Sequence, residues 1–199
     1  MPGRFPRFVI ALPDWIEAFV LPDEVFESRF SRMRLAIRLA SENVIRGSGG
    51  PFGAGVFEIE TGRLIAVGVN LVESSRCSIA HAEAVAIALA QQSLGTHDLA
   101  SRSLPALELV SSAQPCCQCF GMIWWSGVRG LVVGARTEDV ESIAGFREGP
   151  LPDGWADRLR ERPGLVPIDV AVDVLRDEAI VPLQAFRASG GSPYHPGVS

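Results

Sequence analysis

Two short segments of this chain carry side chains that bind transition metals, and their spacing constrains the fold more than any other feature. Residues 81–83 read His-Ala-Glu, and residues 115–119 read Pro-Cys-Cys-Gln-Cys. Cysteines three residues apart point to the same side of a helix, so both thiols can bind one metal ion. Proline suits the first turn of a helix, and the helix dipole there favours thiolate over thiol. The fold must therefore bring the beginnings of two helices together around one ion.

The ligand set favours a catalytic metal site over a structural one. Three side chains supply ligands, namely His81, Cys116 and Cys119. A structural zinc site normally has a fourth protein ligand, and Cys77 or Cys117 could supply it. That alternative gives no role to Glu83, whereas a carboxylate beside zinc can take a proton from bound water. We therefore expect one Zn²⁺ per subunit, with Glu83 as the catalytic proton shuttle.

The other two cysteines bear on the kind of site and on the cellular compartment. Cys117 stands between the two ligand cysteines, and we expect it to point elsewhere as a small buried hydrophobe. We expect Cys77, which precedes the site, to be inert. Three of the four cysteines fall within residues 116–119, which argues against a disulfide framework. The pattern fits metal binding in a reducing compartment, so we expect a cytoplasmic protein.

The charge balance and the apolar pattern argue against several classes of partner. The formal net charge is −5, and non-specific nucleic-acid binding depends on neutralising phosphates. No stretch reaches the ~18 consecutive apolar residues that a membrane span requires. Pro13 and Asp14 interrupt the apolar run near the N-terminus, which favours an arm over a signal peptide. We therefore expect a small-molecule substrate, and neither a membrane nor a nucleic-acid partner.

Apolar periodicity predicts an alternation of helices and strands in one domain. Helices are predicted at about 23–46, 80–92, 116–126, 137–144, 155–162 and 170–188, and strands at 54–59, 63–69, 106–111, 131–135 and 165–168. This order is typical of an α/β domain with helices on both faces of one sheet, and the first two strands form a hairpin that makes the sheet mixed. We expect an N-terminal arm at 1–22, the catalytic domain at 23–188 and a C-terminal tail at 189–199.

At these residues the chain resembles the cytidine deaminase-like superfamily, which has the signature H-x-E…P-C-x-x-C. Within it, the chain is most similar to bacterial guanine deaminases, including forms that also act on the triazine ammeline. The segments that carry the resemblance are GGPFGAGVFE (49–58), GVN (68–70), CSIAHAEAVAI (77–87), ELVSSAQPCCQCFGMIWWSGV (108–128) and GFREGP (145–150). The sequence departs from many relatives at Cys117-Gln118, where they have Pro-Met or Val-Met.

The resemblance implies a fold and a set of substrate contacts. The expected fold is a three-layer αβα sandwich around a five-stranded mixed sheet. The expected assembly is a homodimer in which the C-terminal segment completes the pocket of the neighbouring subunit. The implied contacts are Phe52 stacking on the base, Asn70 hydrogen-bonding its edge, Ala82 offering backbone polar groups, Glu148 as a second catalytic carboxylate, Phe146 lining the pocket and Tyr194 closing over it.

The resulting hypothesis is hydrolytic deamination of guanine to xanthine and ammonia by zinc-activated hydroxide. Ammeline or another triazine, a pterin or cytosine are alternative free-base substrates, since a few hydrogen bonds decide such choices. A tRNA adenosine deaminase uses the same chemistry, but the negative charge and the closing tail disfavour a polyanion. A zinc-stabilised interaction module without activity is the third possibility, and the presence of Glu83 argues against it.

Overall fold

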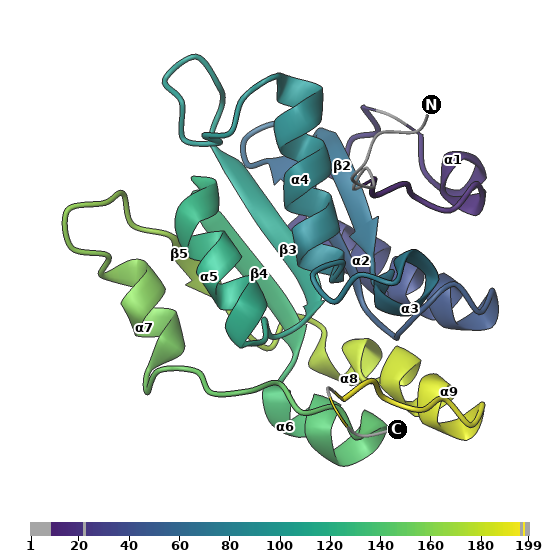
Figure 1. Cartoon of the computed structure of the whole chain (residues 1–199). Helices are drawn as coiled ribbons and strands as arrows, with labels where there is room; N and C mark the ends of the chain where they lie inside the picture. The colour runs from purple at the N-terminus through teal and green to yellow at the C-terminus, as the bar shows by residue number, and fades with distance from the viewer. Residues whose placement is uncertain (1–8, 22, 196, 198–199) are drawn as a thin grey trace, which may run out of the picture.

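A mixed five-stranded sheet lies at the centre of the computed structural model, which describes residues 9–21, 23–195 and 197 (Figure 1). The strand order is β2-β1-β3-β4-β5. β1 pairs antiparallel with both β2 and β3, whereas β3, β4 and β5 are parallel. The strands are β1 (Gly53–Glu58), β2 (Leu64–Val69), β3 (Leu107–Ala113), β4 (Gly130–Ala135) and β5 (Asp169–Ala171).

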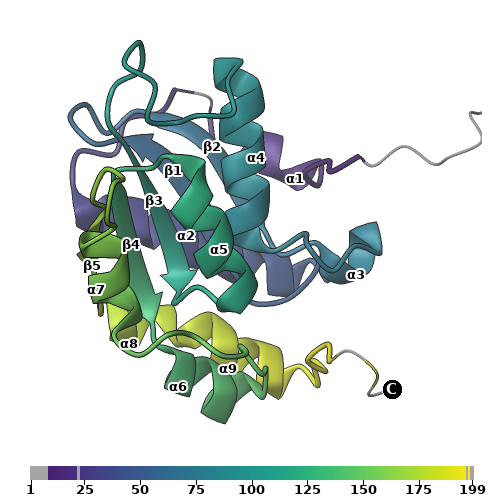
Figure 2. The same cartoon turned by 60° about the vertical axis from the view of Figure 1, so that its left-hand side comes forward.

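Helices cover both faces of the sheet, as the sequence predicts. On one face lie α4 (Ala82–Leu94), α5 (Cys117–Ser126) and α7 (Trp155–Arg160). On the other lie α2 (Arg29–Ile45), α8 (Arg176–Ala179) and α9 (Val181–Ala188). Figures 1 and 2 show α4 and α5 on the side of the sheet opposite to α2. The expected three-layer αβα sandwich is therefore confirmed.

Alternate residues of each strand pack against opposite helical layers, as a period of two requires. On β3, Leu107 and Leu109 join the core beneath α4 and α5, whereas Val110 joins the core beneath α2. The same alternation places Ser111 on the α4 side, where its hydroxyl meets Glu83. The strand pattern thus brings one polar side chain to the beginning of α4.

The long helix α2 begins later than the predicted residue 23. Ser28 caps it, because the Ser28 hydroxyl accepts the Ser31 N–H at 3.1 Å and the Ser31 hydroxyl accepts the Ser28 N–H at 3.2 Å. This reciprocal pair satisfies two backbone donors that have no partner within the helix. Residues before Ser28 extend the sheet instead, through a bridge between Val25 and Arg63.

The C-terminal part also differs from the prediction. The strand predicted at 165–168 is wrong, since β5 lies at Asp169–Ala171 and pairs with β4. The continuous helix predicted from about 170 is replaced by α8 and α9, because Asp173 and Leu175 have positive φ angles of 62° and 54° that no helix accommodates. Apolarity alone does not locate this strand, because Leu165 and Val166 are exposed.

Several short helices complete the fold. They are α1 (Trp15–Phe19), α3 (Val72–Ser75), α6 (Thr137–Asp139) and the π-helix η1 (Val140–Ala144). α1 lies within the predicted arm and packs on α2, since Arg38 lies over the Phe19 ring and Arg46 over the Trp15 ring. Residues 1–8 and 22 of that arm, and residues 196 and 198–199 of the tail, lie outside the described residues. Among the described helices, none has the length and apolarity needed to cross a membrane.

Candidate active site and metal centre

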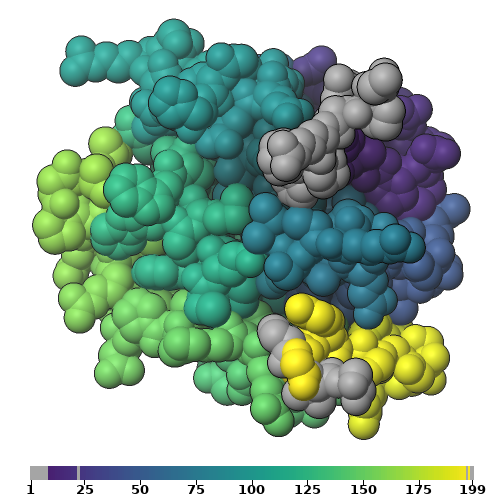
Figure 3. All heavy atoms as spheres, viewed as in Figure 1, coloured from purple at the N-terminus to yellow at the C-terminus, as the bar shows by residue number. Residues whose placement is uncertain are grey.

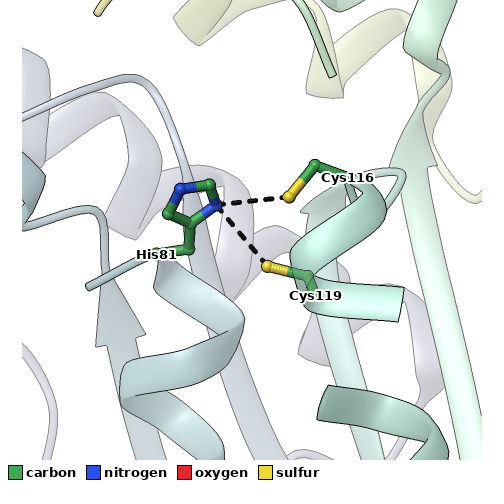
Figure 4. A group of neighbouring side chains, drawn as sticks. All are labelled: His81, Cys116 and Cys119. Atoms are coloured by element: carbon green, nitrogen blue, oxygen red, sulfur yellow. Dashed lines mark hydrogen bonds between the residues drawn. The ribbon is translucent and has the colours of Figure 1, made fainter. Parts of the chain in front are cut away.

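Two helices begin at the predicted metal ligands. His81 is the N-cap residue of α4, and Cys116 is the N-cap residue of α5. Cys119 lies in the first turn of α5. Figure 4 shows the imidazole facing both thiols across the gap between the two helix ends. The local sequence explains this placement, because an N-cap residue has extended backbone and its side chain points out of the helix end.

The distances fit a tetrahedral zinc site. His81 Nδ1 lies 3.4 Å from Cys116 Sγ and 3.6 Å from Cys119 Sγ. The three ligand atoms lie within 4.8 Å of one another. Zinc–sulfur and zinc–nitrogen bonds at tetrahedral angles separate neighbouring ligand atoms by roughly 3.5–3.8 Å. The donor set and its spacing therefore suit Zn²⁺ without rearrangement of the backbone.

Neither of the other cysteines belongs to this cluster. Cys117 is exposed, so the expectation that it is a buried hydrophobe is wrong. Its thiol lies over Gly149, where an added Cβ would come within 2.7 Å of the sulfur. Cys77 is half-buried and lies outside the metal-binding group. Neither Cys77 nor Cys117 therefore supplies the fourth protein ligand that a structural zinc site requires.

The environment of Cys116 favours its thiolate. Hydrogen bonds from the Cys119 thiol and from His81 lower the pKa of Cys116 to about 4, although burial acts in the opposite direction. The N-terminal end of α5 adds the positive end of a helix dipole. Thiolate is the form of cysteine that binds metal, so the folded chain is prepared for the ion.

Glu83 is buried and held from two sides. Its Oε1 accepts a hydrogen bond from the Ser111 hydroxyl at 3.2 Å, and its Oε2 lies 3.4 Å from Cys119 Sγ. Burial raises the pKa of the Glu83 carboxyl, and the charge of Cys116 raises it further. A carboxyl with a raised pKa beside a metal site is suited to proton transfer near neutral pH.

One large cavity joins the metal centre to the residues predicted to bind substrate. Its volume is about 870 Å³, within the range of ligand-binding pockets. His81, Cys116 and Glu83 line it, while Cys119 lies behind them and is fully buried. All of the predicted substrate contacts also line it, namely Phe52, Asn70, Ala82, Phe146, Glu148 and Tyr194.

Aromatic rings form one wall of the cavity. Phe52 and Phe146 meet edge to face with ring centroids 5.0 Å apart. Phe146 also lies against Phe186 of α9, at 5.4 Å between centroids. Phe186 had no signal in the sequence, because nothing local indicates that the last helix reaches the cavity. The wall gives a flat heterocycle an apolar surface to lie against.

Asn70 follows β2 at the edge of the cavity and is 8% exposed. Its Oδ1 accepts the N–H of Val72 at 3.4 Å. This bond fixes which end of the carboxamide faces the backbone, and it leaves the NH₂ group as the donor for a ligand. The arrangement is suited to hydrogen-bonding the edge of a planar ring.

Glu148 lies in the loop that follows η1. Its carbonyl oxygen accepts the N–H of Cys117 at 3.0 Å, which ties the loop to the beginning of α5. Burial raises the pKa of its carboxyl to about 8, with further increases from the charges of Cys116 and Glu83. The cavity therefore holds a second carboxyl that carries a proton near neutral pH.

The C-terminal residues line the cavity of their own chain. Gly190, Ser192 and Tyr194 all contact it, and the Tyr194 residue is 48% exposed. Figure 3 shows the C-terminal part of the chain, in yellow, beside the blue segment that contains α3. The sequence predicts instead that this segment completes the pocket of a neighbouring subunit; a single chain leaves that exchange a prediction.

The sequence analysis missed several polar residues around the cavity. Ser111, Gln114 and Asn43 lie beside or beneath it, and Gln114 accepts the N–H of Thr137 at 3.4 Å. A usable signal existed for two of them. Ser111 continues the Leu107 and Leu109 face of β3, and Asn43 lies three residues after Ala40 on the apolar face of α2. A polar residue in such a pattern indicates a specific buried hydrogen bond.

Comparison with known proteins gives a family match. The model of the "cytidine and deoxycytidylate deaminase zinc-binding region" matches residues 27–135. A guanine deaminase of Bacillus subtilis is 32% identical over 155 residues, which cover 78% of this chain and 91% of the relative.

Solved structures are similar over almost the whole chain. A guanine deaminase from Nitrosomonas europaea has 44% sequence identity and a TM-score of 0.86, covering 94% of this chain and 100% of that chain. A structure in complex with 2,6-diaminopurine has 45% identity and a TM-score of 0.87, covering 95% of this chain and 97% of that one. The likeness therefore extends over the segments that carry the metal ligands and the cavity-lining residues.

Proposed function

The chain belongs to the cytidine and deoxycytidylate deaminase zinc-binding family, and from this premise we propose that it hydrolyses guanine to xanthine and ammonia. The observation that carries the proposal is the single cavity in which the metal ligands, Glu83 and the base-binding residues meet. Two relatives that cover most of the chain are guanine deaminases. Guanine carries an exocyclic amine on a planar ring, which matches a cavity with an aromatic wall and two carboxyls.

The site residues divide the chemistry between them. Zn²⁺ held by His81, Cys116 and Cys119 supplies a Lewis acid that makes water nucleophilic near neutral pH. Glu83 takes one proton from the attacking water and delivers it to the ring nitrogen, then takes the second proton from the new C2 hydroxyl and delivers it to the departing amine. The C2–O bond forms, the C2–N bond breaks, and the amine leaves as ammonia. The Ser111 hydroxyl keeps Glu83 beside the metal ligands during these transfers.

Glu148 supports the same reaction from the loop that follows η1. Its pKa of about 8 means that it carries a proton near neutral pH. A protonated carboxyl can donate a hydrogen bond, and it can move a proton when the charge nearby changes. We assign it the second carboxylate role, close to the exocyclic amine.

Substrate binding uses the face and the edge of the base. In this proposal Phe52 and Phe146 contact the ring face, and the NH₂ group of Asn70 meets an acceptor on its edge. Ala82 offers backbone polar groups at the beginning of α4, and Tyr194 closes over the base. Residues 23–188 then form the catalytic domain, with 1–22 as an arm and 189–199 as a closing tail.

We also place this activity in a homodimer in the cytoplasm, in purine catabolism. An exposed tryptophan on α5, beside a shallow groove between α4 and α5, supports the dimer, because aromatic side chains are enriched at interfaces. Trp125 is 79% exposed there, and Ile87 and Met122 line the shallow groove beside it. The clustered free cysteines support a reducing compartment.

The test is ammonia release from guanine, ammeline, adenine, cytosine and guanosine by zinc-loaded protein. Glu83→Gln is the active-site variant, and Glu60→Gln, in the exposed turn between β1 and β2, is its matched control. We expect guanine turnover in the wild type and the control, and loss of at least ~10³-fold in Glu83→Gln, since general acid–base groups contribute up to ~10⁴-fold. Turnover of another base alone, or retained activity in Glu83→Gln, contradicts the proposal.

A further inference from the structure

We propose that Asn43 is a positioning residue that sets the geometry between the two base-binding side chains, Phe52 and Asn70. This inference rests on the proposed function, because it concerns how the same cavity holds its substrate. Asn43 lies near the end of α2, fully buried, and does not line the cavity itself. Its effect must therefore pass through the residues that it holds.

One carboxamide group ties two separate segments together. Asn43 Nδ2 donates one hydrogen bond to the carbonyl of Gly50 at 2.8 Å and another to the carbonyl of Asn70 at 2.9 Å. Gly50 belongs to the glycine-rich loop before β1, and Asn70 follows β2. Both amide protons of Asn43 are thus used to join the loop that precedes Phe52 to the residue proposed to read the base edge.

Backbone hydrogen bonds close this connection into a ring. The Phe52 N–H donates to the same Gly50 carbonyl at 2.8 Å, and the Asn70 N–H donates to the Phe52 carbonyl at 3.2 Å. Hydrogen bonds thus connect Asn43 to Phe52 through the Gly50 carbonyl, and connect Asn43 directly to Asn70. A displacement of either segment would break several of these hydrogen bonds, so the two segments are held in one fixed arrangement.

Close packing of Gly49 against Asn70 leaves this loop little freedom. A Cβ on Gly49 would lie 2.0 Å from the Asn70 carbonyl oxygen. A Cβ on Gly50 would make only ordinary contacts, at 3.4 Å from the Phe52 ring and 3.5 Å from the Asn70 carboxamide carbon, so the tight approach is at Gly49. Backbone can approach so closely only where a side chain is absent. The loop is therefore built against Asn70, with Asn43 beneath both.

The side-chain oxygen of Asn43 indicates that this residue does more than fill space in the core. Within the described residues, its buried Oδ1 accepts no hydrogen bond. Leaving a buried carbonyl oxygen unpaired is costly, and an apolar side chain would fill the same space without that cost. What the site needs from Asn43 is the pair of donors.

The expected consequence is a change in binding rather than in the chemical step. Phe52 contacts the face of the base and Asn70 its edge, so loss of their mutual geometry weakens substrate and transition state alike. Such uniform loss raises KM and leaves kcat nearly unchanged. The metal ligands lie on α4 and α5, outside the ring of bonds around Asn43, so zinc content should not change.

The test compares guanine KM and kcat in zinc-loaded wild type, Asn43→Ala, Asn43→Ser and Leu35→Ala. Leu35 is buried on the same helix, two turns before Asn43, and controls for loss of stability. We expect Asn43→Ala to raise KM by about two- to tenfold, which corresponds to the loss of one net hydrogen bond. Asn43→Ser retains one donor and should fall between the two, and Leu35→Ala should destabilise the fold while keeping the wild-type KM.

A binding measurement separates this inference from the proposed function. In the Glu83→Gln background, the Kd for guanine should rise in parallel with KM when Asn43 is changed to Ala or Ser. An unchanged KM and Kd in both Asn43 variants, a fall in kcat at constant KM, or loss of zinc would overturn the inference. A wild type that binds guanine without deaminating it contradicts the proposed function alone, and the Kd comparison still tests Asn43.

Discussion

At the scale of single residues, one hydrogen bond from Ser111 positions the carboxylate of Glu83, the proposed proton shuttle. Glu83 stands on the first turn of α4, and its position there fixes only the direction in which the side chain leaves the helix. Ser111, from the opposite element β3, fixes the carboxylate itself through the 3.2 Å bond to Oε1. The next residue, Ser112, faces the other layer, where it accepts the N–H of Gly53 at 3.1 Å. Neighbouring serines of one strand therefore have different roles.

We predict that Ser111→Ala lowers kcat for guanine by about 10- to 100-fold, since a hydrogen bond to a charged group contributes about 1.5–3 kcal/mol. Zinc content should remain complete, because no metal ligand is changed. Ser111→Thr keeps the hydroxyl and should recover most of the activity. Steady-state kinetics with metal analysis checks both.

Ser112→Ala is the matched control for this prediction. It removes a buried hydroxyl of the same size from the same strand, and should lower stability without a comparable loss of kcat. Equal losses of kcat in the two alanine variants would show that Ser111 acts through the strand rather than through Glu83.

At the scale of elements, a buried ion pair locks α2 to the centre of the sheet. Arg32 Nη1 and Glu108 Oε1 lie 2.5 Å apart, and both side chains are almost fully buried. Arg32 also donates to the carbonyls of Phe26 and Ile59, so each of its three side-chain nitrogens makes a hydrogen bond. The same α2 carries Asn43, so the position of the whole helix against β3 bears on the cavity.

We predict that Glu108→Gln lowers the free energy of unfolding by about 3–5 kcal/mol, because it leaves the Arg32 charge buried without a counter-charge. The control is Glu178→Gln, which breaks the exposed pair between α8 and Arg34 of the same helix α2. Exposed pairs contribute about 0–1 kcal/mol. Urea unfolding of both variants checks the difference, and equal losses would contradict the assignment of Arg32 and Glu108 as the lock.

At the scale of the whole molecule, the outer surface of α4 and α5 is the proposed interface of the homodimer. The sheet is enclosed by helices on both sides, yet the outer surface of α5 exposes Trp125 beside a shallow groove. The proposed homodimer buries this surface. Since α4 and α5 also carry the metal ligands, an interface there would restrain the two helix ends that hold the ion.

We predict a dimer by light scattering at micromolar concentration, and a shift toward monomer in Trp125→Glu, because a charge on an apolar interface opposes its burial. The control is Val181→Glu on α9, an exposed apolar residue away from that face. A wild-type monomer, or a dimer that both variants leave intact, contradicts the proposed interface.

The local sequence was sufficient for the metal centre and for the fold class. His81, Cys116 and Cys119 stand at helix N-termini, and the sequence itself marks these with the apolar run that begins at Ala82 and with Pro115. The order of helices and strands likewise indicated a mixed sheet between two helical layers. The helix ends and the order of elements depend on neighbours within a few residues, so a local pattern can report them.

Long-range contacts were decided by the tertiary structure. Three contacts join residues far apart in the chain. They are the contact between the Phe186 and Phe146 rings, the hydrogen bonds from Asn43 to the carbonyls of Gly50 and Asn70, and the pairing of β5 with β4. The close approach of Cys117 to Gly149 likewise joins two separate segments. Residue type and periodicity determine which chemistry the chain can perform; the distances and buried hydrogen bonds that arrange it arise only when separate elements pack, because no local pattern specifies which surfaces will meet.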